Sequence, residues 1–255
     1  MARGIFVNGV EGAGLPADDP GFTLGLNVFE TLRTYGRSPF RLGAHLARLA
    51  ASASAIEVPV PGELEGEIRA VAAANRDIWI RVALTAGGNR VLQFESVDQA
   101  KIGAPVRVAS VQMAPTPWLP GSVKHGSRAG WVLAAKALGV EEVVFVDPAG
   151  DILEANRSNV FAVVGGVIRT PANDGEKLEG VTRGALLEAA AEAGLAVEVG
   201  PLPLSAPFGE LYLSSTLKQL APVVDIDGRE VGGGPVGAAL LAAFRAIVAR
   251  ECGVA

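Results

Sequence analysis

The sequence has few of the residues that build several common kinds of functional site. It contains one cysteine, Cys252, and two histidines, His45 and His125. A single cysteine cannot form an intrachain disulfide, and so few cysteines and histidines predict neither a zinc cluster nor a histidine-rich metal site. We therefore expect chemistry that uses a cofactor, carboxylates or a lysine, and no metal.

Long apolar runs and clusters of basic charge are also missing. No unbroken apolar stretch is long enough to cross a bilayer, and the first residues, MARGIFVNGVEG, lack the apolar centre of a signal peptide. The formal net charge is −5, with no basic cluster. This charge argues against a nucleic acid as partner. We expect a cytoplasmic protein that binds neither nucleic acid nor membrane.

The chain does have enough apolar residues for a core. It has 255 residues, of which 49% are hydrophobic, and this size suits one large domain or two ordinary ones. Apolar alternation with turn residues predicts strands or hairpins, and helical spacing predicts helices. The predicted strand regions are 4–12, 25–42, 77–94, 104–113, 141–155, 158–171, 195–200 and 210–216. The predicted helices are 44–58, 62–75, about 127–138, 182–194 and 237–250.

Residues 114–121, APTPWLPG, contain three prolines and a glycine, a composition typical of a linker or ordered loop. We predict an N-terminal domain at 1–114, a linker at 115–121 and a C-terminal domain at 122–255. Hairpins dominate, and the regular alternation of a doubly wound fold is missing. The predicted class is α+β in two domains.

Lysine is scarce, with five lysines among the 22 lysines and arginines. A lysine amine can lose its proton and act as a nucleophile, whereas arginine stays charged. Lys124 follows the proline-rich boundary and precedes a helix, where an active site between domains is expected. Lys136 lies within a predicted helix, and Lys101 and Lys177 lie in polar loops, so solvent-facing roles suffice for these three. Lys218 adjoins a Ser/Thr cluster and remains an alternative.

Three places suit an anion, and each also has an ordinary structural explanation. Gly180 precedes a helix opened by Val181 and Thr182, where free N–H groups bind phosphate well; the alternative is a routine helix with Thr182 as N-cap. Ser215 and Thr216 either hold phosphate oxygens or simply end a strand. His45 and Arg48 lie three residues apart on one helix face, as a structural pair or with Arg48 facing a phosphate. The glycines of GVEGAG and GGGPVG are interpreted as turns.

Glu154 ends a predicted strand in ILEANRSNVF. Such a residue is usually solvated. Alternatively, a buried carboxylate keeps the ring nitrogen of a pyridoxal cofactor protonated, which makes the ring an electron sink. This alternative also needs a lysine to attach the cofactor and a site for its phosphate, and the sequence has candidates for both.

Five segments in order resemble the fold-type IV pyridoxal-phosphate enzymes, the class IV aminotransferase family. The similar segments are FETLRTYGRSPFRLGAHLARL, VKHGSRAGW, ILEANRSNVFAV, LEGVTRGALLE and LYLSSTLKQLAPVVDIDGR. The resemblance covers almost the whole chain. It implies a small N-terminal α/β domain, a larger C-terminal domain with a barrel-like sheet, and a homodimer that binds pyridoxal 5′-phosphate and a small amino substrate.

The resemblance also implies roles for individual residues. Lys124 would attach the cofactor covalently and shuttle protons, and Glu154 would pair with the ring nitrogen. The residues implied for the phosphate are Arg48, Val181, Thr182, Thr216 and, more weakly, Ser215.

The resemblance leaves more than one reaction of the family open. Branched-chain aminotransferases have a tyrosine five residues after the lysine, where this chain has Ala129. Arg128 instead resembles the lysine segment of some aminodeoxychorismate lyases, and Thr31 matches a threonine implicated in that group. The R-x-H carboxylate trap of D-amino acid aminotransferases is missing, and Arg81 or Arg90 is available to bind a substrate carboxylate.

We therefore expect a lyase that converts 4-amino-4-deoxychorismate to 4-aminobenzoate and pyruvate. The alternative is an aminotransferase of the branched-chain or D-amino acid type. A further alternative, from another class, is a non-catalytic relative with the same fold.

Overall fold

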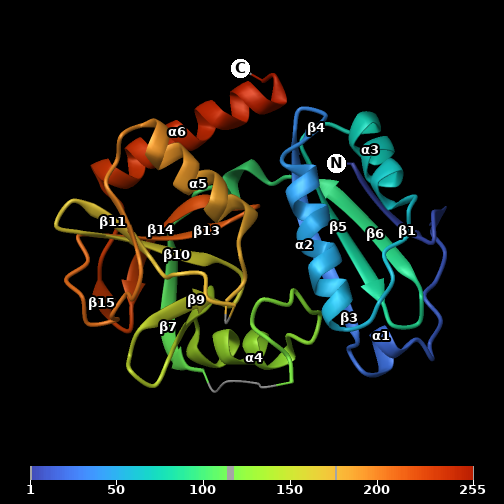
Figure 1. Ribbon diagram of the computed structural model, residues 1–255, viewed down its shortest axis with the longest axis horizontal. Coiled ribbons are helices and arrows are strands. Elements are labelled where there is room, and N and C mark those ends of the chain that lie inside the picture. The colour runs from blue at the N-terminus through green and yellow to red at the C-terminus, as the bar shows by residue number, and fades with distance from the viewer. Residues whose placement is uncertain (1, 114–117, 176, 255) are drawn as a thin grey trace. The chain divides into compact units, whose positions relative to one another are not determined.

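The structure is a computed structural model that describes residues 2–113, 118–175 and 177–254. The chain forms two compact units (Figure 1). Unit 1 comprises Met1–Asp98, Val123–Arg128 and Val248–Ala255, and unit 2 comprises Gln99–Ser122 and Ala129–Ile247.

Unit 1 is built on an antiparallel sheet whose described strands run in the order β2-β1-β6-β5-β3-β4. The strands are β1 (Arg3–Val7), β2 (Val10–Glu11), β3 (Asn27–Tyr35), β4 (Ser38–Pro39), β5 (Ile78–Thr85) and β6 (Arg90–Ser96). The predicted hairpins at 4–12, 25–42 and 77–94 are confirmed. The turn between β1 and β2 has Asn8 and Gly9 at positive φ, as a type I′ turn requires. The glycines of GVEGAG thus lie at a hairpin.

The helices of unit 1 are α1 (Pro20–Thr23), α2 (Leu42–Ala55) and α3 (Leu64–Ala74). Alternate residues of β5, namely Ile78, Ile80, Val82 and Leu84, are buried, because successive strand side chains point to opposite faces. Leu49 and Ala53 on α2 and Ile68 on α3 are also buried. The other face of β5 carries Trp79, Arg81 and Ala83, which are half-buried or exposed.

Unit 2 contains a nine-stranded sheet in its described part, ordered β12-β11-β10-β13-β14-β7-β8-β9, with β15 paired to β14. The strands are β7 (Val106–Gln112), β8 (Glu142–Val146), β9 (Ile152–Ala155), β10 (Asn159–Val164), β11 (Val167–Thr170), β12 (Val197–Val199), β13 (Glu210–Ser215), β14 (Gln219–Ile226) and β15 (Arg229–Glu230). The pairs β7–β8, β7–β14 and β11–β12 are parallel, and the other pairs are antiparallel. Both units therefore mix helices with largely antiparallel sheet, which confirms the α+β class.

Unit 2 contains η1 (Gln99–Lys101), α4 (Ala129–Leu138), α5 (Val181–Glu192) and most of α6 (Pro235–Cys252). The core of its sheet includes Val144, Val160, Leu211 and Leu213. The last residues of α6 belong to unit 1, where Arg41 Nη2 binds Glu251 Oε1 at 2.8 Å. Among the described residues, the structure has no helix that is long and apolar enough to span a membrane.

A buried carboxylate explains the glycine-rich run before α6. Glu210 accepts hydrogen bonds from the N–H groups of Val236 and Gly237, at 3.0 and 2.8 Å, and from the Tyr212 hydroxyl at 2.6 Å. A Cβ on Gly237 would lie 2.0 Å from Tyr212 Cζ, so this residue must be glycine. Burial, with the bond to Glu210, raises the pKa of Tyr212. The run is structural, but it is not the predicted turn: it leads into α6, and Gly237 lies within the first turn of that helix.

The two units do not follow the predicted segments 1–114, 115–121 and 122–255. Residues 99–113 belong to unit 2 because β7 pairs with β14 and β8. Residues 123–128 belong to unit 1, where Gly126 N–H donates to the carbonyl of Asn27 at 2.9 Å. Residue 114 and residues 115–117 of the predicted linker lie outside the described residues. Local composition indicated a break near 114, but hydrogen bonding between distant strands determines which unit each segment joins.

Candidate functional site

The segment that carries Lys124 is fixed by its backbone. Phe29 N–H, on β3, donates to the carbonyl of Lys124 at 2.9 Å, and Lys124 N–H donates to Ser52 Oγ, on α2, at 3.1 Å. Ser52 is buried, whereas Lys124 is half-buried. The lysine side chain therefore extends from a backbone that is held on two sides.

Three cationic side chains of unit 1 surround the ring of Phe29. Arg81 Cζ lies 4.2 Å from the ring centroid, Lys124 Nζ 5.0 Å and Arg128 Cζ 5.4 Å. The ring face attracts cations, and Phe29 itself is buried. The charges of the three side chains repel one another, so a negatively charged group is favoured beside them.

Thr31 lies next to this cationic cluster. It is the cross-strand partner of Arg81, whose other cross-strand partner is Gln93 on β6. Thr31 follows Phe29 by two residues, so both side chains point to the same face of the sheet. The structure thus places Lys124, Arg128, Arg81 and Thr31 in one region of unit 1.

Arg48 is held by a buried carboxylate on β3. Arg48 Nε donates to Glu30 Oε1 at 2.6 Å, Arg48 Nη2 donates to Glu30 Oε2 at 2.8 Å, and His45 Nδ1 lies 2.8 Å from the same Oε2. Burial alone would raise the pKa of Glu30, but the hydrogen bonds from His45 and Arg48 and the charge of Arg48 outweigh burial and lower it to about 2. Burial lowers the pKa of His45, which favours the neutral imidazole. The pairing of Arg48 with Glu30 does not test the prediction that Arg48 contacts a phosphate.

Arg90 does not join the cluster around Phe29. It forms a bidentate pair with Glu67 on α3, through bonds of 2.9 and 2.6 Å, and it also lies 3.8 Å from Glu63. The hydrogen bonds that Arg90 donates to Glu67, opposed by burial, raise the pKa of Arg90. Its guanidinium is thus already matched by a carboxylate of the same unit. Of the two predicted carboxylate binders, only Arg81 lies with Lys124.

In unit 2, Glu154 lies on β9 and accepts a hydrogen bond from Leu178 N–H, with Oε2 at 3.3 Å from the nitrogen. Glu154 is half-buried rather than fully solvated. Leu178 shortly precedes α5, so the segment that leads into this helix contacts the carboxylate. The sequence indicated Glu154 and the start of this helix separately, and the structure connects them.

Helix α5 begins at Val181, and its N-cap is Gly180. The prediction that Thr182 is the N-cap is therefore wrong. Gly180 has no side chain to bind the first N–H groups of the helix, which leaves them available to an anion. Ser215 ends β13, and its Oγ accepts a hydrogen bond from Lys218 N–H at 3.4 Å; Thr216 lies in the following turn.

Two other lysines have carboxylate partners in unit 2. Lys218 Nζ contacts Oε1 of the fully buried Glu142, which also accepts a hydrogen bond from Ser158 Oγ at 3.0 Å. Lys177 Nζ lies 2.6 Å from Asp174 Oδ2. The expectation that Lys177 faces solvent is wrong, because its side chain is buried.

Three residues that contact Arg48 or Lys124 were not predicted from the sequence: Glu30, Phe29 and Ser52. Phe29 and Glu30 directly precede Thr31 in the segment FETL. Ser52 follows His45 by seven residues and Arg48 by four, so helical spacing already put all three on one face. That spacing was a usable signal.

The chain is similar to known proteins along most of its length. Residues 27–226 match the family model described as amino-transferase class IV. A putative branched-chain-amino-acid aminotransferase of Methanocaldococcus jannaschii is 30% identical over 248 residues, covering 86% of this chain and 85% of that protein. A D-alanine aminotransferase of Listeria monocytogenes is 25% identical over 271 residues, with 95% and 94% covered.

Solved structures agree with the sequence relatives. The crystal structure of a putative branched-chain amino acid aminotransferase from Thermotoga maritima superposes with a TM-score of 0.87 at 26% identity, covering 96% of this chain and 96% of that one. The fold is that of the fold-type IV enzymes, with a curled, half-barrel sheet. The chain belongs to the class IV aminotransferase family, whose cofactor is pyridoxal 5′-phosphate.

The family membership confirms the predicted fold and cofactor. It also agrees with the stated alternative of an aminotransferase more closely than with the lyase, since the three relatives above are named as aminotransferases. The roles of individual residues remain predictions.

Proposed function

We propose that this enzyme transfers an amino group between an amino acid and a 2-oxo acid, one of which carries a second carboxylate. The observation that supports this proposal is the convergence of Arg81, Arg128 and Lys124 on the ring of Phe29. A guanidinium binds a carboxylate through two parallel hydrogen bonds. Two arginines beside the reactive lysine suit an acidic substrate better than a wholly apolar one.

The chemistry of the donor groups fits pyridoxal 5′-phosphate. Unit 1 by itself contains the Lys124 amine. Unit 2 by itself contains the Glu154 carboxylate and the start of α5 at Gly180, which has no side-chain cap. When bound, the cofactor supplies an electron sink for negative charge that develops at the substrate α-carbon. A carboxylate stabilises a protonated ring nitrogen, and helix N–H groups stabilise a phosphate.

The proposed roles follow from these groups. Lys124 attaches the cofactor and, when released, removes and returns the proton at the substrate α-carbon. Glu154 keeps a proton on the ring nitrogen. The proposed phosphate-binding residues are Arg48, Val181, Thr182, Ser215 and Thr216. The substrate carboxylate is bound by Arg81 and Arg128.

The lyase remains a second candidate because of two specific observations. Arg128 follows Lys124 by four residues and lies beside the same ring, with Ala129 where branched-chain aminotransferases have a tyrosine. Thr31 is the cross-strand partner of Arg81. The lyase substrate, 4-amino-4-deoxychorismate, also carries two carboxylates, so the cationic cluster suits either reaction.

A substrate panel read by the cofactor spectrum separates the candidates. An aminotransferase converts the bound cofactor to its pyridoxamine form when an amino donor is added without an acceptor. Acidic donors such as glutamate and aspartate are expected to act at lower concentration than leucine or alanine. Formation of 4-aminobenzoate from aminodeoxychorismate, without conversion by any amino donor, would establish the lyase instead. A colourless protein that binds no cofactor would indicate a non-catalytic relative.

Replacing Arg81 with alanine should weaken substrate binding. Loss of a charge-assisted hydrogen-bond pair costs roughly 1.5–3 kcal/mol, which corresponds to about a 10- to 150-fold rise in KM for an acidic substrate. Steady-state kinetics measure this change. Arg90→Ala is the matched control, because Arg90 lies on the adjacent strand but is paired with Glu67. A larger KM effect from Arg90→Ala than from Arg81→Ala would contradict the assignment.

We also propose that the enzyme is a homodimer that acts on small amino substrates, as the resemblance to the family implies. Sedimentation of the purified holoenzyme at several protein concentrations tests the oligomeric state. A monomer that turns over substrate would disprove this part of the proposal and leave the chemistry intact.

A further inference from the structure

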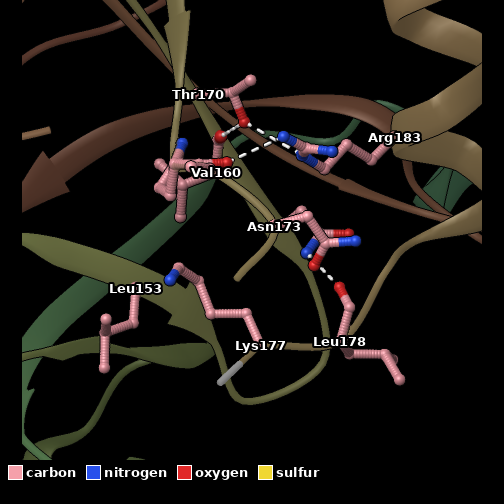
Figure 2. A pocket seen from close by; sticks show the side chains of 10 residues that line it. Leu153, Val160, Thr170, Asn173, Lys177, Leu178 and Arg183 are labelled. Carbon is pink, nitrogen blue, oxygen red and sulfur yellow. Dashed lines mark hydrogen bonds between the residues drawn. The ribbon is translucent and has the colours of Figure 1, made fainter. Parts of the chain in front are cut away.

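A small pocket in unit 2 is lined in part by the segment that leads into α5 (Figure 2). The lining residues used below are Asn159, Thr170, Pro171, Leu178 and Arg183. Asn159 is the first residue of β10 and is half-buried. Its Nδ2 donates to the carbonyl of Leu178 at 2.9 Å, and a dashed line marks this bond at Leu178 in Figure 2. A side chain of the sheet thus binds the segment just before the helix.

Leu178 is bonded on both sides of its backbone. Its carbonyl accepts from Asn159, and its N–H donates to Glu154 Oε2 at 3.3 Å. The position of Leu178 therefore sets the direction of its N–H group, which contacts Glu154. The backbone of Leu178 thus links the side chain of Asn159 to that of Glu154.

Gly180 packs directly against the same amide. A Cβ at this position would lie 1.9 Å from Asn159 Oδ1 and 3.1 Å from Asn159 Cγ. The backbone of Gly180 has φ −68 and ψ 125, a conformation that any residue adopts. Glycine is needed here for space beside Asn159, and not for its backbone freedom.

Helix α5 has a separate anchor. The buried Arg183, in its first turn, donates from Nε to Thr170 Oγ1 at 3.3 Å and from Nη2 to the carbonyl of Pro171 at 2.7 Å (Figure 2). Thr170 Oγ1 in turn donates to the carbonyl of Val160 at 2.8 Å. Because these bonds do not involve Asn159, loss of its amide should displace residues 178–180 and leave the helix attached.

We propose that Asn159 is a positioning residue for the cofactor: through Leu178 it orients the carboxylate of Glu154. The proposal rests on the proposed role of Glu154 at the ring nitrogen. Asn159 does not touch the reacting atoms in this scheme. It holds Leu178 and Gly180 in the position from which the N–H of Leu178 reaches Glu154 Oε2.

The variant Asn159→Ala tests the proposal in the purified holoenzyme. Cofactor binding, followed by absorbance or fluorescence titration, is expected to weaken roughly tenfold, since the carbonyl of Leu178 loses its partner. The pH dependence of the visible absorbance of the bound cofactor should shift in the same direction as in Glu154→Gln, by a smaller amount. In the double variant the two shifts should not add, because both act through one carboxylate.

Two further variants sharpen the comparison. Asn173→Ala removes the same side chain from another residue that lines the pocket and is exposed, and it should leave the spectrum and the affinity unchanged. Gly180→Ala should weaken cofactor binding in the wild-type background, because its Cβ collides with Asn159 Oδ1. In the Asn159→Ala background, the same change should have much less effect.

The outcomes of these experiments are distinct. A lower melting temperature of Asn159→Ala, with unchanged cofactor affinity and spectrum, would show a purely structural role and overturn the proposal. Equal effects of Gly180→Ala in both backgrounds would also overturn it. If Glu154→Gln itself leaves the cofactor spectrum unchanged, the proposed role of Glu154 fails, whatever Asn159→Ala does.

Discussion

Replacing Lys124 with alanine is expected to abolish covalent attachment of the cofactor and to reduce turnover by at least roughly 10²- to 10⁴-fold. That range is what a positioned proton-transfer group contributes in enzymes, and the loss of covalent attachment adds to it. The backbone of Lys124 is held by Phe29 and Ser52, so the alanine variant should fold normally. Borohydride reduction followed by peptide mass spectrometry should find a pyridoxyl group on Lys124 in the wild type.

Two other replacements make this test specific. Lys124→Arg keeps the positive charge beside Phe29 but has no amine that can lose its proton, so it should be as inactive as the alanine variant. Lys136 is exposed on α4, and Lys136→Ala should be fully active. A pyridoxyl group found on Lys218 would show that the wrong lysine had been chosen.

Replacing Glu30 with glutamine should destabilise the protein by about 3–5 kcal/mol. Glu30 is buried and receives two hydrogen bonds from Arg48 and a contact from His45. Removing one partner of a buried ion pair leaves the other charge without compensation, which carries a cost of this size. Urea unfolding of both proteins, with equal m-values, gives the difference directly.

An exposed ion pair provides the matched control for Glu30. Glu65 and Arg69 lie four residues apart on α3, with both side chains at least half exposed. Glu65→Gln should change the free energy of unfolding by no more than about 0.5 kcal/mol. If the two glutamine variants were equally stable, Glu30 would not have the importance assigned to it here.

The same carboxylate predicts a dependence of stability on pH. The pKa of Glu30 is lowered from its ordinary value of 4.5 to about 2 in the folded protein. A lowered carboxylate pKa stabilises the folded state above the ordinary value, and this contribution of about 3 kcal/mol disappears as the pH falls from 4.5 towards 2. Glu30→Gln should lose less stability than the wild type across this range. Parallel slopes of stability against pH would contradict the assignment.

The sequence predicted local structure well wherever neighbouring residues determine it. The hairpins at 4–12 and 77–94 depend on adjacent turn residues and alternating strand residues, and both formed as expected. The division at 114 failed because β7 joins the second sheet through β14, which lies far along the chain. No pattern within residues 99–113 indicates that partner.

Residue types that suit a function were predicted better than their actual partners. Arg81 and Arg90 are equivalent in the sequence, since both are arginines in one hairpin. Only the structure shows that Arg90 is paired with Glu67 on α3, whereas Arg81 lies over the ring of Phe29. Lys177 was expected to face solvent because its neighbours in the sequence are mostly polar. Its burial depends instead on how the loop folds, which its immediate neighbours do not indicate.

Helices α5 and α6 both begin directly after a glycine in unit 2, and they differ in the bond from α6 to the carboxylate of Glu210. At α6 this carboxylate accepts hydrogen bonds from the N–H groups of Val236 and Gly237, so these groups already have a partner within the chain. At α5 the equivalent place has no side-chain anion from its N-cap residue, Gly180. The N–H groups that begin α6 are therefore already bonded within unit 2, which leaves the start of α5 as the one of the two that suits the proposed phosphate site.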